Sequence, residues 1–173
     1  MKQHIWMSRL KPLTVLPVLL MLSTIFGFSN QNAETSSGLS QKVSMGIVTT
    51  FDSLLDQNWE KDTMEDYAEK IEYPIRKAAH VSEYLILTLL TAIPLGVYGV
   101  RGKKLILSLF LFCVLCAAGD EFHQSFIPGR SPQFTDVLID STGILAGCGI
   151  TFLILRNCTS HSRFADQPDT YKR

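Results

Sequence analysis

Histidines and carboxylic acids stand close together in two runs of this chain, and both runs border long apolar segments. His80 and Glu83 are three residues apart in the run RKAAHVSEY, and Asp120 and His123 have the same spacing in the run DEFHQSFIPGR. Residues three apart share one face of a helix. A histidine beside a carboxylate can act as a general base near neutral pH. The spacing therefore predicts a site for acid–base chemistry or for binding a polar ligand.

The same side chains would be costly if they faced lipid. A charged residue at the centre of a membrane helix costs roughly 2.5–3.5 kcal/mol on insertion scales. Counting about 1.5 Å per residue from the far end of each apolar segment brings polar pairs on three helices to one height. Asp136 and Asp140, four residues apart, form the pair on the last helix. We therefore expect these groups to face one another, water or a ligand in a hydrophilic pocket.

Such a pocket could supply a base, an acid and a holder for an anion. A guanidinium holds a phosphate through two parallel hydrogen bonds, which is the role we expect for the arginines. The catalytic candidates are His80, Glu83, Asp120, Glu121 and His123. The ligand-binding candidates are Arg76, Gln124, Arg130, Asp136 and Asp140. No serine or cysteine stands out as a nucleophile, so a histidine or an activated water would have to take that part.

Several interpretations of this pocket remain open from the sequence. It could act on a phosphate-containing lipid or lipid-linked substrate, bind such a ligand without catalysis, or form a polar network that only holds the helices together. Transport is a further possibility, although four helices are few for a carrier. His80, Glu83, Asp120 and His123 could offer two nitrogens and two oxygens to zinc. The tight HExxH pattern is absent, and we expect neither a metal nor another cofactor.

The composition indicates one membrane domain. A length of 173 residues allows a single domain, and the apolar 46% is concentrated in four segments. A helix needs about 20 residues to cross a bilayer. We expect an all-α polytopic protein, with four transmembrane helices in a bundle and short extracytoplasmic surface helices. The expected spans are residues 12–29, 75–98, 104–123 and 134–155, within a membrane domain of residues 1–157 that is followed by a cytoplasmic tail at 158–173.

Charge placement predicts the orientation and excludes one class of partner. The flanks before the first segment, between the second and third, and after the fourth hold ten basic and two acidic residues. The positive-inside rule then places both termini in the cytoplasm, with the pocket outside. The formal net charge is zero, which argues against a nucleic-acid partner. As an alternative, the first segment could be a signal peptide cleaved after Ser29.

Residues 30–74 form the predicted outer loop. Val43, Ile47 and Phe51 recur at helical spacing, and a second apolar stripe follows nearer the second span. Pro74 is expected to mark a break before that span or its first turn. We expect these two helices to lie on the outer membrane surface as a lid, with a solvated linker as the alternative.

Three smaller features receive structural interpretations. Cys113 and Cys116 form a CxxC inside an apolar helix, where they are expected to be small buried hydrophobic residues. Gly143 and Gly147 are expected to let two helices approach closely. Lys77 points about 100° away from its neighbour Arg76 on a helix, so we expect it to reach toward the lipid head groups.

The chain resembles the VanZ-like family of small bacterial membrane proteins over about residues 25–149. The resemblance rests on RKAAHVSEY, on DEFHQSFIPGR, and on Asp136 and Asp140 followed by the two glycines. The stretch FSNQ departs from the family in having Asn30 where a serine is common. The family takes its name from a member that gives low-level resistance to the glycopeptide teicoplanin.

The resemblance implies a retained first helix and a role at the cell surface, without implying an established reaction. The implied partners are a membrane lipid, a lipid-linked cell-wall precursor or a glycopeptide antibiotic. Neither the residues nor the resemblance indicates an oligomeric state.

Overall fold

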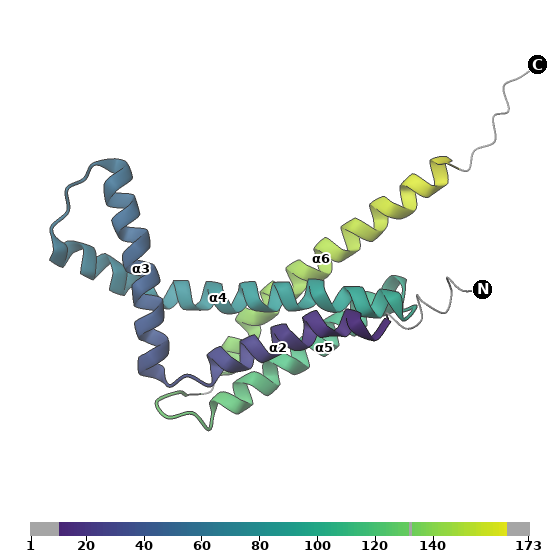
Figure 1. Cartoon of the computed structure of the whole chain (residues 1–173), viewed down its shortest axis with the longest axis horizontal. Coiled ribbons are helices and arrows are strands. Elements are labelled where there is room, and N and C mark those ends of the chain that lie inside the picture. Colours follow the sequence, from purple (N-terminus) through teal and green to yellow (C-terminus); the bar gives the residue numbers. More distant parts are fainter. Residues whose placement is uncertain (1–10, 132, 166–173) are drawn as a thin grey trace, which may run out of the picture.

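Helices account for all the regular structure in the part of the chain that is described, as predicted. The computed structural model describes residues 11–131 and 133–165. The elements are η1 (Lys11–Val15), α2 (Leu16–Ser29), α3 (Ala33–Leu55), α4 (Lys61–Val97), α5 (Gly102–Gln124) and α6 (Phe134–Ala165), shown in Figure 1. Four helical stretches within these described residues are long and apolar enough to cross a membrane: Lys11–Ser29, Lys61–Val97, Gly102–Gln124 and Phe134–Asn157.

The chain ends bear on two predictions. Four members of the basic flanks lie outside the described residues, namely Lys2, Arg9, Lys172 and Arg173. The predicted tail at 158–173 begins inside α6, which continues to Ala165, and the remaining residues lie outside the described part.

α4 is much longer than the predicted span at 75–98. It runs without interruption from Lys61 to Val97 and contains Pro74 in its interior. The prediction of a break or a first turn at this proline is wrong. A proline inside a helix removes one backbone hydrogen bond and costs about 3 kcal/mol. The packing of α3 along this part of α4 offsets that cost, since α3 and α4 share one of the most extensive contacts in the fold.

α3 presents its faces in an unexpected way. The apolar residues Val43, Ile47 and Phe51 are 48%, 40% and 55% exposed, while Ser40 and Ser44 are buried. The small hydroxyl residues therefore lie on the packed side of the helix, and the apolar stripe lies on its free surface. Figure 1 shows α3 set across the direction of the long helices, at the end of the bundle where α2 ends. This arrangement is what a helix lying along a membrane surface requires.

Two glycines bring α6 against α4. A Cβ added at Gly143 would lie 2.1 Å from the carbonyl oxygen of Val81, and one at Gly147 would lie 2.8 Å from Cβ of Thr88. Backbones can approach this closely only where one side chain is missing. The structural interpretation of these glycines is confirmed.

The helices bury a narrow core and expose a wide apolar surface. Ile25, Leu87, Leu109 and Ile144 are at most 1% exposed and bring α2, α4, α5 and α6 together. Cys113 is fully buried among them and unpaired, which confirms its predicted role as a small hydrophobic residue. Apolar residues also cover the free surfaces of the spans. In the most apolar 18-residue segment of each span, only 17–39% of the residues are buried. Such a surface is stable in lipid, which is as apolar as the side chains that face it.

Candidate functional site

A cavity of about 160 Å³ lies between α4, α5, α6 and the loop that joins α5 to α6. Seven of the ten predicted site residues line it: Arg76, His80, Glu121, Gln124, Arg130, Asp136 and Asp140. They come from segments far apart in the sequence, so the predicted meeting of polar groups from three helices is present. Glu83, Asp120 and His123 do not line this cavity.

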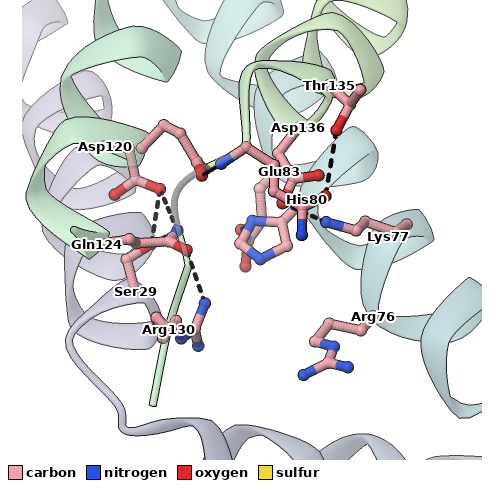
Figure 2. Close-up of polar contacts among 12 residues, drawn as sticks. Ser29, Arg76, Lys77, His80, Glu83, Asp120, Gln124, Arg130, Thr135 and Asp136 are labelled. Carbon is pink, nitrogen blue, oxygen red and sulfur yellow. Dashed lines mark hydrogen bonds and ion pairs between the residues drawn. The ribbon is translucent and has the colours of Figure 1, made fainter. Parts of the chain in front are cut away.

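Arg76 and Arg130 approach the cavity from different elements. Arg130 donates from Nη1 to Oε1 of Gln124 at 2.9 Å. Arg76 donates from Nη1 to the hydroxyl of Ser37 at 3.2 Å. In Figure 2 the two guanidinium groups lie on opposite sides of the space below His80.

The position of Arg130 depends on the turn before it. Gly129 has φ of 76°, a backbone conformation that side chains rarely adopt, and a Cβ there would lie 3.2 Å from Cβ of Ala33. The Nε atom of Arg130 is buried and has no hydrogen-bond partner among the residues that the structure describes. Burial and, next, the positive charge of Arg76 lower the pKa of Arg130 from its usual value. A guanidinium remains protonated nonetheless, so two like charges face the same cavity.

Lys77 also belongs to the cavity, contrary to the prediction that it reaches the head groups. Its Nζ lies 2.5 Å from Oδ2 of Asp136, and the two side chains are 18% and 20% exposed. This ion pair links α4 to the start of α6. Lys77 precedes His80 by three residues and therefore shares its helix face. That spacing was the signal in the sequence that could have identified it.

His80 lies at the centre of the group and Glu83 lies behind it. The Nδ1 atom of His80 is 3.5 Å from Oε2 of Glu83, on the same helix. Neither of these two atoms has a hydrogen-bond partner within the described residues. The pair has the arrangement of an imidazole beside an orienting carboxylate, at a distance longer than a hydrogen bond.

A second polar network joins α2 to α5. Ser29 donates to Oδ2 of Asp120 at 2.7 Å, and Gln124 donates from Nε2 to the same oxygen at 3.0 Å. Asp120 is only 2% exposed. Through Gln124 the network continues to Arg130, as the dashed lines in Figure 2 show. Asp120 therefore supports the arginine without lining the cavity itself.

Ser29 was not among the predicted site residues. The polar stretch FSNQ after the first apolar segment was the available signal. The side chain of Ser29 is fully buried, and its hydroxyl bonds to Asp120 of α5. The first helix therefore contributes a side chain to the folded site. Cleavage after Ser29 would remove this hydroxyl together with the rest of the first helix, so its contact with Asp120 favours the retained helix over the signal-peptide alternative.

His123 and Glu121 are close in sequence but contact different parts of the protein. The His123 ring packs edge-on against Phe26 of α2, with centroids 5.8 Å apart. The Nδ1 atom of His123 is buried without a hydrogen-bond partner in the described residues. Glu121 accepts a hydrogen bond from the backbone N–H of Gln133 at 2.5 Å. Glu121 therefore holds the loop that carries Arg130, while His123 lies apart from the cavity.

The zinc interpretation finds no geometric support. Within residues 11–131 and 133–157, no three His, Cys, Asp or Glu side chains gather in a way that could hold a metal ion. Of its four proposed ligands, Asp120 is bonded to Ser29 and His123 lies against Phe26.

The family model described as VanZ/LLP1 matches residues 14–155 of the chain. This range covers the four candidate spans almost completely, together with α3 and every residue that lines the cavity. No curated protein and no solved structure matches the chain.

Proposed function

The chain belongs to the VanZ/LLP1 family, and on that premise we propose that this multi-pass membrane protein binds a polar or anionic head group in the cavity beside Arg76 and Arg130. The ligand class is a membrane lipid or a lipid-linked cell-wall precursor. By holding such a molecule at the outer leaflet, the protein would contribute to resistance against glycopeptides such as teicoplanin.

The observation that carries this proposal is the presence of two guanidinium groups in one small cavity. Like charges that face each other are stabilised by an anion between them, and arginine is the side chain best suited to hold a phosphate. Lys77 adds a third cation; Asp136 pairs with it, as Glu72 pairs with Arg76. A volume of about 160 Å³ suits a head group rather than a whole lipid or antibiotic. The protein would then act on glycopeptide resistance by binding the cell-wall precursor that the antibiotic targets, and not the antibiotic itself.

The proposed orientation places the cavity outside a bacterial cytoplasmic membrane and both termini in the cytoplasm. It rests on the basic residues at the turn between α4 and α5, including Lys103 and Lys104, and on the acidic residues near α3. Labelling of single cysteines in a cysteine-free protein tests it in intact cells. An impermeant reagent should reach Glu65→Cys and should miss Lys104→Cys, and the reverse pattern would overturn the orientation.

Binding of farnesyl diphosphate to the purified protein in detergent tests the ligand class, with farnesol as the uncharged counterpart. We expect the diphosphate to bind and Arg130→Gln to weaken it about tenfold or more, because a hydrogen bond to a charged group contributes about 1.5–3 kcal/mol. Lys42→Gln is the matched control, since Lys42 is an exposed cation on α3 that does not line the cavity. The proposal would be refuted if Arg130→Gln and Lys42→Gln bound the diphosphate with equal affinity. It would also be refuted if the unaltered protein bound farnesol as tightly as farnesyl diphosphate.

A second candidate function is hydrolysis or group transfer at the phosphate of such a ligand. The placement of Glu83 behind His80 favours it, because a carboxylate can orient an imidazole that activates water. Release of inorganic phosphate from farnesyl diphosphate measures this activity. His80→Ala and Glu83→Gln should abolish release while leaving diphosphate binding within a few-fold. If the unaltered protein binds the diphosphate but releases no phosphate, the catalytic function is refuted and only the binding function remains.

A further inference from the structure

A second and larger hollow lies at the opposite end of the helices from the polar cavity. It has a volume of about 1040 Å³ and is lined mainly by apolar side chains of α5 and α6, including Ile106, Phe110, Leu145 and Phe152. Residues of the turn between α4 and α5 also line it. Figure 1 shows α6 diverging from α4 and α5 toward its C-terminal end.

The charged residues of the groove all have one sign. Arg101, Lys103 and Arg156 line it, and no acidic residue among those that the structure describes does. Arg101 and Lys103 flank the start of α5, whose first turn contains no acidic residue and whose N-cap side chain makes no capping hydrogen bond. The positive end of a helix dipole favours an anion rather than further cations. Arg101 and Lys103 thus place two positive charges at the rim of the groove, beside the positive end of α5.

The length of the groove matches one leaflet of a membrane. Leu145 and Arg156 both line it and are eleven residues apart on α6, a rise of about 16 Å. Half of a bilayer's hydrocarbon core is about 15 Å thick. The basic rim therefore lies at head-group level when the apolar walls lie among acyl chains.

We propose that this groove is a binding site for an anionic phospholipid of the leaflet at the α4–α5 turn. The phosphate lies between Arg101 and Lys103, and one acyl chain lies along Ile106, Phe110 and Leu145. Under the orientation proposed above this is the cytoplasmic leaflet, but the site does not depend on the function of the polar cavity. A second copy of the chain fits the groove less well, because a symmetric contact would bring the same cations together.

The test uses the purified full-length protein in nanodiscs and two neighbouring lysines. Lys103 lines the groove and Lys104 does not, although both are exposed on the same turn of α5. Native mass spectrometry counts retained dioleoylphosphatidylglycerol against dioleoylphosphatidylcholine. We expect the anionic lipid to be retained preferentially, and Lys103→Ala to weaken that retention about fivefold, the effect of one cation near an anionic head group. Lys104→Ala should retain it as the unaltered protein does.

A second pair of variants tests the apolar wall. Gly96 lines the groove and Gly149 does not, and a Cβ at either position meets no atom within 4 Å. Gly96→Phe should therefore reduce lipid retention at least as much as Lys103→Ala, and Gly149→Phe should not.

Equal losses from Lys103→Ala and Lys104→Ala would mean that only the general surface charge attracts the lipid, and would overturn the site. Equal retention of the two lipids would do the same. A dimer in the unaltered protein that Gly96→Phe dissociates would assign the groove to a second copy instead. Should Gly96→Phe not fold, as judged by circular dichroism, the comparison of the two lysines decides alone.

Discussion

Gly143 on α6 lies against the backbone of Val81 on α4, with no room for a side chain between the two helices. A Cβ on the glycine would come within 2.1 Å of the Val81 carbonyl oxygen. His80 immediately precedes Val81, and Asp140 lies one turn before Gly143; both line the polar cavity. This backbone contact therefore sets the height at which the polar groups of α4 and α6 meet.

We expect Gly143→Ala to destabilise the protein by about 1–3 kcal/mol or more, because the new methyl group overlaps a backbone atom that no side-chain rotation can move. The midpoint of thermal unfolding in detergent measures the effect. Gly149→Ala is the matched control, since its Cβ meets no atom within 4 Å on the same helix and alanine favours helices over glycine. Identical midpoints for the two variants would show that α4 and α6 do not touch at this point.

Ser29→Ala should destabilise the protein by about 1–3 kcal/mol, because it removes a hydrogen bond to the buried carboxylate of Asp120. The same variant should weaken ligand binding at Arg130, which the network reaches through Gln124. Thermal unfolding and diphosphate binding together measure the two effects. Ser23→Ala, an exposed position on the same helix, should change neither. Loss of stability equal to that of Ser23→Ala would contradict the proposed role of Ser29.

Lys77→Met should cost about 1–3 kcal/mol, since it leaves the partly buried Asp136 without its partner. The exposed pair of Lys70 and Asp66 provides the control, with side chains 63% and 59% exposed. Lys70→Met should cost less than about 1 kcal/mol.

Replacing both charged residues by apolar ones tests the same contact in a second way. Lys77→Met combined with Asp136→Leu should recover most of the lost stability, because no buried charge then remains unpaired. A double variant as unstable as the sum of the two single changes would indicate that the two residues do not interact.

The exposed stripe of α3 should contact lipid. An environment-sensitive dye on Ile47→Cys, in protein freed of its own cysteines, should be quenched by bromine-labelled acyl chains in nanodiscs. Thr49→Cys is the control, because Thr49 is also exposed but lies about 200° away around the helix. Similar quenching at both positions would argue against a helix that lies on the membrane with one face down.

The spans and most of the site could be predicted because both follow from local sequence. An apolar window of about 20 residues has few alternatives to a membrane helix, and polar groups such as His80 and Asp140 cannot remain among acyl chains at its edge. The predicted break at Pro74 failed because tertiary packing outweighs the local preference of a single residue. The surroundings of His123 could not be predicted, since they depend on a ring of another helix.

By itself, the sequence determined that four helices are apolar enough to cross the membrane and that the histidines and carboxylates of three of them lie at one height. Only the tertiary structure decided which of these groups touch. Lys77 pairs with Asp136, and Ser29 binds Asp120, because the rotation and height of each helix are set by packing between segments far apart in the chain. The direction of the apolar stripe on α3 was decided in the same way, since two buried serines pack inward and leave that stripe free.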